Sequence, residues 1–139
     1  MYSCEKDDFC VEANTPKLII RYLDFADQAN FKSVTLDFIY ANDLGSYTES
    51  VGISTDSIAI PLDFLNNQTT YYFQKENESA EEINFTYTRE NIFVSRSCGF
   101  KVNYKDLNLT QITNHWIQKI TIENPSITDE QNAHLYIYH

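Results

Sequence analysis

The sequence contains little glycine, proline or cysteine, and few basic residues. Its 139 residues include only three each of Gly, Pro and Cys. With so few Gly and Pro, turns must depend on Asn and Asp, which tolerate left-handed backbone better than other residues. Lys and Arg number 10 against 20 Asp and Glu, so the net charge is −10. Because phosphate binding depends on clustered cations, this balance argues against a nucleic-acid partner.

Long apolar runs and catalytic motifs are also missing. No stretch approaches the roughly 18 consecutive apolar residues that a transmembrane helix needs. The serine-hydrolase elbow, the P-loop, the dinucleotide fingerprint and the H-E-x-x-H motif are all absent. We therefore predict no catalytic residues, no cofactor and no enzymatic activity. The rival hypothesis is an enzyme built from scattered residues, for which the candidates are His115, Asp129 and Glu130.

The histidines do not have the spacing of a metal site. Zinc needs three or four convergent ligands, whereas His115, His134 and His139 lie on separate predicted segments. We expect ordinary surface or strand-end histidines and no metal. A thiol–imidazole pair of Cys98 with His115 is an alternative that a disulfide on Cys98 would abolish.

An acidic stretch at residues 76–82 is the other candidate for a metal site. Calcium loops place oxygen ligands at fixed spacing, usually with a glycine at the turn, and this stretch does not have that form. We expect a solvated acidic loop. Its carboxylates are Glu76, Glu78, Glu81 and Glu82.

The chain does contain many aromatic residues and a clear period-two alternation. Hydrophobic residues make up 42% of the sequence and aromatic residues 14%, which indicates a packed core. Alternating β-branched and aromatic residues predict half-buried strands. The predicted strands are residues 17–23, 34–40, 50–54, 57–62, 69–75, 83–88, 92–95, 100–105 and 114–123, and a last strand with Ala133, Leu135 and Ile137 facing inward. Helix signals are weak, with single turns conceivable at 24–31 and 106–113.

This spacing of strands predicts an all-β fold, an antiparallel β-sandwich or barrel, and we favour the sandwich. It resembles an immunoglobulin domain in architecture only, because Trp116 follows both Cys10 and Cys98 instead of lying between them. In the 34–40 strand we place Val34, Leu36, Phe38 and Tyr40 on one face. Exposed aromatic residues are candidates for contacts with a protein or a glycan. These candidates are Tyr71, Tyr72, Trp116, Tyr136 and Tyr138.

The N-terminus resembles that of a mature bacterial lipoprotein. Cys4 follows a small residue and is followed at once by a charged, acidic stretch, Glu5-Lys6-Asp7-Asp8. The same stretch resembles the signal that directs lipoproteins to the outer face of the outer membrane in Bacteroidota. Met1 stands where that pattern usually has an aliphatic residue, and the apolar stretch is missing. The resemblance implies a lipid on Cys4, and the alternative is an ordinary charged tail.

Further segments resemble a family of small lipoproteins of unknown function found in Bacteroidota. The resembling segments are residues 4–10, 15–21, 56–62 and 93–101, of which the first and the last are the most specific. The resemblance implies an exported, lipid-anchored β domain, and it implies no activity.

Three cysteines allow three pairings, each of which leaves one thiol over. If Cys4 carries lipid, Cys10 and Cys98 are left to form a disulfide. On the chain-entropy model, the bond would stabilise the fold by roughly 4–5 kcal/mol. Three reduced cysteines in a cytosolic protein are the alternative.

Together these features predict residues 1–14 as a lipoprotein N-terminus and tether, and residues 15–139 as a single β-sandwich domain. The expected location is the outer membrane, lipid-anchored and exposed at the cell surface. The expected partners are the membrane, through the lipid on Cys4, and an unidentified envelope protein or glycan. We predict a non-enzymatic binding or accessory module of unknown biochemical activity. A structural subunit of an envelope complex is the alternative.

Overall fold

The computed structural model describes residues 15–41, 45–46, 51–75 and 78–139, and the regular secondary structure in these ranges is β-strand. In this part of the chain no helix is long and apolar enough to span a membrane. The all-β prediction is therefore confirmed. The strands are β1 (Leu18–Leu23), β2 (Val34–Ala41), β3 (Gly45–Ser46), β4 (Ser54–Thr55), β5 (Ser57–Ile60), β6 (Gln68–Lys75), β7 (Glu81–Ser95), β8 (Gly99–Gln111), β9 (Lys119–Ile122) and β10 (Leu135–Tyr138).

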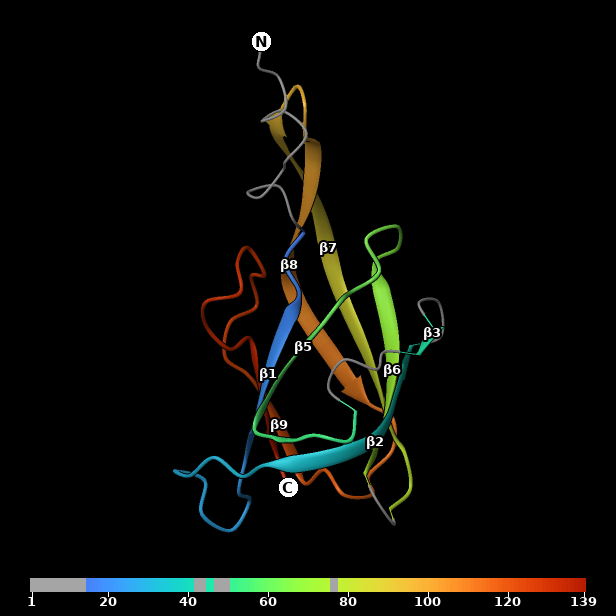
Figure 1. Cartoon of the computed structure of the whole chain (residues 1–139), viewed down its shortest axis with the longest axis vertical. Helices are drawn as coiled ribbons and strands as arrows, with labels where there is room; N and C mark the ends of the chain where they lie inside the picture. Colours follow the sequence, from blue (N-terminus) through green and yellow to red (C-terminus); the bar gives the residue numbers. More distant parts are fainter. Residues whose placement is uncertain (1–14, 42–44, 47–50, 76–77) are drawn as a thin grey trace.

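The strands form two sheets, as a sandwich requires (Figure 1). The four-stranded sheet has the order β5-β1-β10-β9, and the six-stranded sheet has the order β3-β2-β6-β7-β8 with β4 paired to β2. The neighbours are antiparallel except β1 and β10, which run parallel and join the two ends of the domain. The predicted antiparallel sandwich thus contains one parallel pair.

The core lies between the sheets and consists of alternate residues from both. The inward residues of β1 and β10 are fully buried, as are those of β6 and the first half of β7. Large aromatic side chains fill this space, and the hydroxyls of Tyr71, Tyr87 and Tyr104 bond to backbone carbonyls within it. Tyr71 donates to the Pro61 oxygen at 2.6 Å, and Tyr104 donates to the Leu62 oxygen at 3.3 Å.

Strand β2 contains a β-bulge that changes which residues face the core. The pairing with β6 shifts between Leu36 and Phe38. A one-residue shift sends the following side chains to the opposite face of the sheet. Ile39 and Ala41 are therefore buried, whereas Phe38 is 41% exposed. Our prediction that Phe38 and Tyr40 lie on the same face as Val34 and Leu36 was wrong beyond the bulge.

Strands β7 and β8 are longer than the sequence suggested. The predicted strands 83–88 and 92–95 are parts of the single strand β7, and the conceivable turn at 106–113 lies largely within β8. A second bulge shifts their pairing between Thr86 and Thr88, opposite Asp106, whose φ is 56°. Asp tolerates this left-handed backbone better than most residues.

Beyond this bulge the β7–β8 hairpin projects past the body of the molecule (Figure 1). We call residues 91–102 the arm, from the Asn91–Val102 pair to the turn. None of the side chains in the arm is fully buried. The turn ends at Gly99, whose φ of 76° favours glycine.

Candidate binding face

The outer face of the six-stranded sheet carries the side chains that alternate with the core residues. On β6 the buried residues are Thr69, Tyr71 and Phe73, so the side chains between them point outward. The register then aligns outward residues of neighbouring strands in rows across the sheet. One row is Tyr40, Tyr72 and Glu82, and the next is Thr70, Asn84 and Thr110.

Three aromatic residues form a continuous strip on this face, which we call the aromatic strip: Phe38, Tyr40 and Tyr72. The rings of Phe38 and Tyr40 are stacked, with centroids 5.9 Å apart and planes inclined by 12°. The Tyr72 ring lies 6.0 Å from that of Tyr40 on the neighbouring strand. The Tyr72 hydroxyl donates to Glu82 Oε2 at 3.3 Å, which orients that ring. The strip therefore presents apolar ring surface with polar groups at its edge.

Amide and hydroxyl side chains lie beside the strip on the same sheet. Asn84 Nδ2 donates to Thr70 Oγ1 at 2.8 Å and, more weakly, to Gln68 Oε1 at 3.4 Å. Thr86, Asn108 and Thr110 are exposed on the strands beyond. Such groups both donate and accept hydrogen bonds. We call the aromatic strip together with Thr70, Asn84, Thr86, Asn108 and Thr110 the sheet face.

Three of the five aromatic residues predicted for binding are buried, although only Tyr71 lies on an inward strand position. Tyr71 is fully buried. Trp116 is 5% exposed and donates through Nε1 to the Phe73 oxygen at 3.3 Å. Tyr138 is 8% exposed. These three side chains have almost no surface for a ligand, which corrects the prediction for them.

The other two aromatic candidates are partly exposed, in different places. Tyr136 is half-buried on the four-stranded sheet, with its ring edge-on to Phe31 at 6.3 Å. Tyr72 belongs to the aromatic strip. Its companions Phe38 and Tyr40 were not among the predicted binding residues, because the bulge in β2 reverses their orientation. The available signal was the run Phe38-Ile39-Tyr40-Ala41, which places apolar residues on both faces of the strand.

The comparisons with known proteins give one match. A family model described as "Family of unknown function (DUF6452)" matches residues 38–139, which is most of the chain. The chain belongs to this family. No curated protein and no solved structure matches it.

The DUF6452 match contains the whole sheet face, since Phe38 is its first residue and Thr110 lies well within it. It also contains two segments of the resemblance described above, residues 56–62 and 93–101. Residues 4–10 and 15–21 lie outside the matched range. The family has no described function. The match therefore shows which family the chain belongs to and does not indicate an activity.

Glu81 is a buried carboxylate and not part of a solvated loop. It is fully buried at the start of β7. Its Oε2 accepts hydrogen bonds from the backbone N–H groups of His115 and Ile117, both at 2.7 Å, and its Oε1 accepts one from Thr113 Oγ1 at 2.6 Å. These bonds hold the segment before β9, which is why β9 begins at Lys119 and not at the predicted residue 114. The role of Glu81 is structural.

The candidate residues for the enzyme hypothesis do not form a common site. His115 is exposed, in the segment bound by Glu81. Asp129 and Glu130 instead lie near His134, and their charges act on its pKa. Within the described ranges there is no pocket and no group of three or more potential metal ligands.

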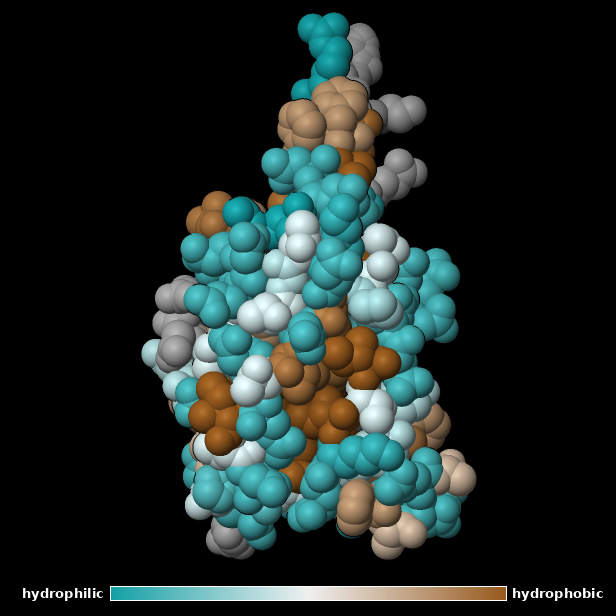
Figure 2. Space-filling model, turned by 180° about the vertical axis from the view of Figure 1, so that it is seen from behind, coloured by the Kyte–Doolittle hydropathy of each residue, from teal (hydrophilic) through white to brown (hydrophobic). Residues whose placement is uncertain are grey.

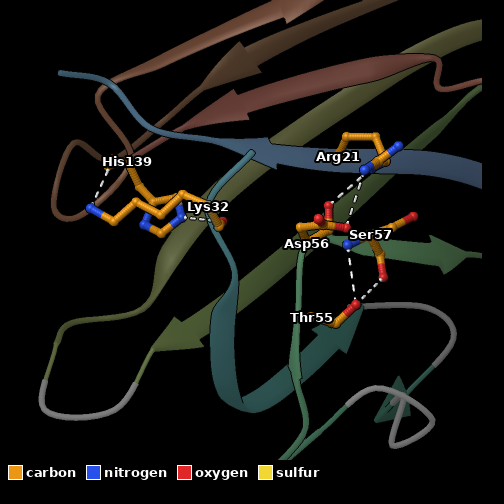
Figure 3. Close-up of polar contacts among 6 residues, drawn as sticks. All are labelled: Arg21, Lys32, Thr55, Asp56, Ser57 and His139. Carbon is orange, nitrogen blue, oxygen red and sulfur yellow. Dashed lines mark hydrogen bonds and ion pairs between the residues drawn. The ribbon is translucent and has the colours of Figure 1, made fainter. Parts of the chain in front are cut away.

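The two buried histidines bond the C-terminal part of the chain to β1 and to the segment that follows β1. His134 Nδ1 accepts a hydrogen bond from the Ile19 N–H at 3.0 Å. His139 Nε2 lies 2.9 Å from the Lys32 oxygen, and Lys32 Nζ donates to the His139 oxygen at 3.4 Å (Figure 3). Burial lowers the pKa of His134 and of His139, and nearby lysines lower that of His139 further. Both side chains act as structural hydrogen-bonding groups.

A second polar cluster joins β1 to the turn between β4 and β5 (Figure 3). Arg21 Nη2 donates to Asp56 Oδ1 at 3.2 Å, and its guanidinium lies 3.8 Å from the centroid of the Phe31 ring. Thr55 Oγ1 accepts from the Ser57 N–H at 3.2 Å and donates to the Ser57 oxygen at 2.9 Å. All of these groups satisfy one another, so the cluster stabilises the turn.

Cys4 and Cys10 lie outside the described residues, so the lipid on Cys4 and the Cys10–Cys98 pairing stay predictions. Cys98 lies in the turn of the arm, where its N–H donates to Ser95 Oγ at 3.1 Å.

Proposed function

We propose that this chain is a non-enzymatic binding module whose sheet face takes a neutral glycan. The observation that carries the proposal is the aromatic strip beside a field of amide and hydroxyl groups. Aromatic rings offer rigid apolar area against the C–H faces of a sugar ring. Asn and Thr side chains both donate to and accept from sugar hydroxyls.

The charge of the protein supports a neutral ligand over an acidic one. A net charge of −10 repels polyanions at long range. Beside the aromatic strip, the carboxylate of Glu82 is an acceptor that suits hydroxyl donors. We therefore expect weaker binding of uronic-acid or phosphorylated polymers than of neutral ones.

We also propose that the module is attached to the bacterial outer membrane, at the cell surface, by lipid on Cys4. The support is the resemblance of residues 1–8 to a lipoprotein N-terminus. Two acyl chains anchor a protein stably where one does not, and mature lipoproteins carry more than one. The proposal that the protein comes from a member of the Bacteroidota rests on the same resemblance.

The proposed Cys10–Cys98 disulfide is compatible with where the described chain begins. The Val102 N–H donates to Thr15 Oγ1 at 3.0 Å, so the chain enters the fold beside the arm. Cys10 precedes Thr15 by five residues, and Cys98 precedes Val102 by four. An extended chain covers about 3.4 Å per residue, so the residues between Cys10 and Thr15 supply enough length for the proposed bond to Cys98.

The test is affinity electrophoresis against a panel of neutral and acidic polysaccharides. We expect retardation by at least one neutral polymer, and a loss of roughly tenfold or more in affinity for Tyr72→Ala and for Phe38→Ala. Tyr136→Ala is the matched control, because it removes a half-buried tyrosine from the other sheet. Wild-type affinity in both strip variants would overturn the sheet face as the binding site.

A non-reducing peptide mass map of the protein from native membranes tests the attachment separately. An acylated Cys4 peptide and a linked Cys10–Cys98 peptide are the expected results. Three unmodified thiols would refute both the anchor and the disulfide, and would leave the glycan proposal standing.

A further inference from the structure

A second surface, which differs in composition from the sheet face, lies on the arm. Phe93 and Phe100 face each other across β7 and β8, and they are 58% and 64% exposed. Their rings are packed edge to face, with centroids 5.4 Å apart. The two rings do not reach the core. Core packing therefore does not explain why large aromatic residues occupy these exposed positions.

Further apolar residues make the arm hydrophobic along much of its length. Ile92 and Val94 are only half-buried, whereas Val102, at the base of the arm, packs against the core. Figure 2 shows hydrophobic surface gathered on the projecting end of the molecule, with hydrophilic atoms around and beyond it. The pattern is that of an amphipathic element that enters the boundary between water and lipid.

The charge of the arm is opposite to that of the chain as a whole. Between Asn91 and Val102 the sequence has two cations, Arg96 and Lys101, and no Asp or Glu. In the whole chain, acidic residues outnumber basic ones by 20 to 10. An anionic surface therefore attracts the arm and repels the rest of the protein, which orients the molecule with the arm toward that surface.

We infer that the arm is a membrane-contacting element that inserts Phe93 and Phe100 into the interface of an anionic lipid bilayer. Arg96 lies in the turn three residues after Phe93, and Lys101 follows Phe100 on β8. Long cationic side chains reach lipid phosphates while their stems stay in the apolar layer. The entry of the chain at Thr15, bonded to Val102, puts the arm at the end of the domain to which the proposed tether leads. This inference concerns residues outside the sheet face and does not need the lipid on Cys4.

The test is co-flotation of the full chain, prepared without lipid, with vesicles. The vesicles are phosphatidylcholine alone or phosphatidylcholine mixed with phosphatidylglycerol. We expect binding to the mixed vesicles that weakens with added salt. Replacing both phenylalanines, Phe93→Ser and Phe100→Ser, should lower the partition coefficient roughly tenfold.

The matched control removes two exposed apolar residues away from the arm, Phe25→Ser and Ile112→Ser, which are 44% and 51% exposed in the wild type. This control should bind vesicles like the wild type. The charge variant, Arg96→Gln with Lys101→Gln, should lose about fivefold per cation on mixed vesicles. Equal urea midpoints for all variants show that the fold is kept.

A spectroscopic readout follows insertion directly. The single native tryptophan, Trp116, is buried and gives a constant background. In Phe100→Trp, mixed vesicles should shift the emission of the new indole to shorter wavelength. In Phe25→Trp they should not.

Two results would overturn the inference. One is the absence of vesicle binding by the wild type, and the other is binding by the double phenylalanine variant at wild-type strength. If vesicles fail but a stoichiometric protein co-purifies and is lost in that variant, the arm contacts protein and not lipid. Polysaccharide affinity measured on the same variants should be unchanged, so failure here and failure of the glycan proposal are distinguishable.

Discussion

Strands β7 and β8 are bonded to each other from Ile83–Gln111 to Ser95–Gly99, yet their two ends have different surroundings. Near the body, Ile83 and Phe85 are fully buried under the four-stranded sheet. In the arm, Phe93 has the same parity as Phe85 on the same strand and is 58% exposed. The pairing of β7 with β8 continues into the arm, whereas the four-stranded sheet does not extend over it.

This difference shows that strand pairing and burial are separate properties of a hairpin. Backbone hydrogen bonds between the strands satisfy the peptide groups at both ends. Burial depends on a second layer, which reaches only the first half of the hairpin. Apolar side chains in the uncovered half therefore contribute little to the stability of the isolated fold and remain available for contacts.

The largest expected effect comes from deleting equivalent phenylalanines at the two ends. Phe85→Ala should lower the free energy of unfolding by about 3–5 kcal/mol, because it leaves a cavity in the core. Phe93→Ala should change it by less than about 0.5 kcal/mol. Urea titration followed by circular dichroism measures both. Similar losses at the two positions would mean that the arm is covered in solution.

Two glutamates on β7, Glu81 and Glu90, allow the same comparison of a buried with an exposed position for polar groups. Glu81→Ala should cost about 3 kcal/mol, because it leaves the buried N–H of Ile117, the part-buried N–H of His115 and a hydroxyl without their acceptor. Glu90→Ala removes only an exposed ion pair with Lys105 at 4.0 Å, so its effect should be within about 0.5 kcal/mol. The same titration compares them. A neutral Glu81→Ala variant would contradict the structural role of this carboxylate.

Lowering the pH should destabilise the four-stranded sheet before it affects the arm. Burial lowers the folded-state pKa of His134 and His139, so the unfolded chain binds protons first as the pH falls. Stability is therefore full above the ordinary histidine pKa of about 6.5 and decreases below it. Urea midpoints measured between about pH 7 and about pH 5 should fall, and His134→Gln should flatten this slope. His115→Gln, at an exposed position, is the control and should leave the slope as it is.

The smallest effect is expected at the β7–β8 bulge, which precedes the arm. Asp106 has a φ of 56°. This left-handed backbone conformation destabilises an ordinary residue with a β-carbon by about 1 kcal/mol. Asp106→Ala should therefore destabilise the protein by about that amount, whereas Asp106→Gly should be nearly neutral. Thermal unfolding of the two variants side by side gives the difference. An equal effect of Ala and Gly would show that the left-handed backbone is not retained in solution.

The sequence was sufficient to predict strands whose pairing is regular. The inward faces of β10 and of the first half of β7 follow from simple alternation, because Leu135, Ile137, Ile83 and Phe85 repeat every two residues. Alternation alone identifies two faces of a strand. It assigns the inner face correctly when the apolar residues are all on one side.

Other features depend on neighbouring strands and could not be predicted in this way. The reversal of Phe38 and Tyr40 arises from a bulge in the pairing of β2 with β6, which is a property of two strands. The burial of Glu81 depends on donors more than thirty residues further along the chain. Trp116 was placed on a strand by its spacing, but it precedes β9 in a segment held by that carboxylate.

The parallel pairing of β1 with β10 has a consequence for how the domain forms. The Ile19 N–H bonds to His134 across 115 residues of chain, and β10 lies between β1 and β9 in the four-stranded sheet. Such distant contacts give a high contact order, and the entropy of closing long loops makes folding slow. While the ribosome still holds β10, β1 and β9 have no strand between them. The four-stranded sheet therefore closes only once β10 has emerged, and until then the nascent chain stays open.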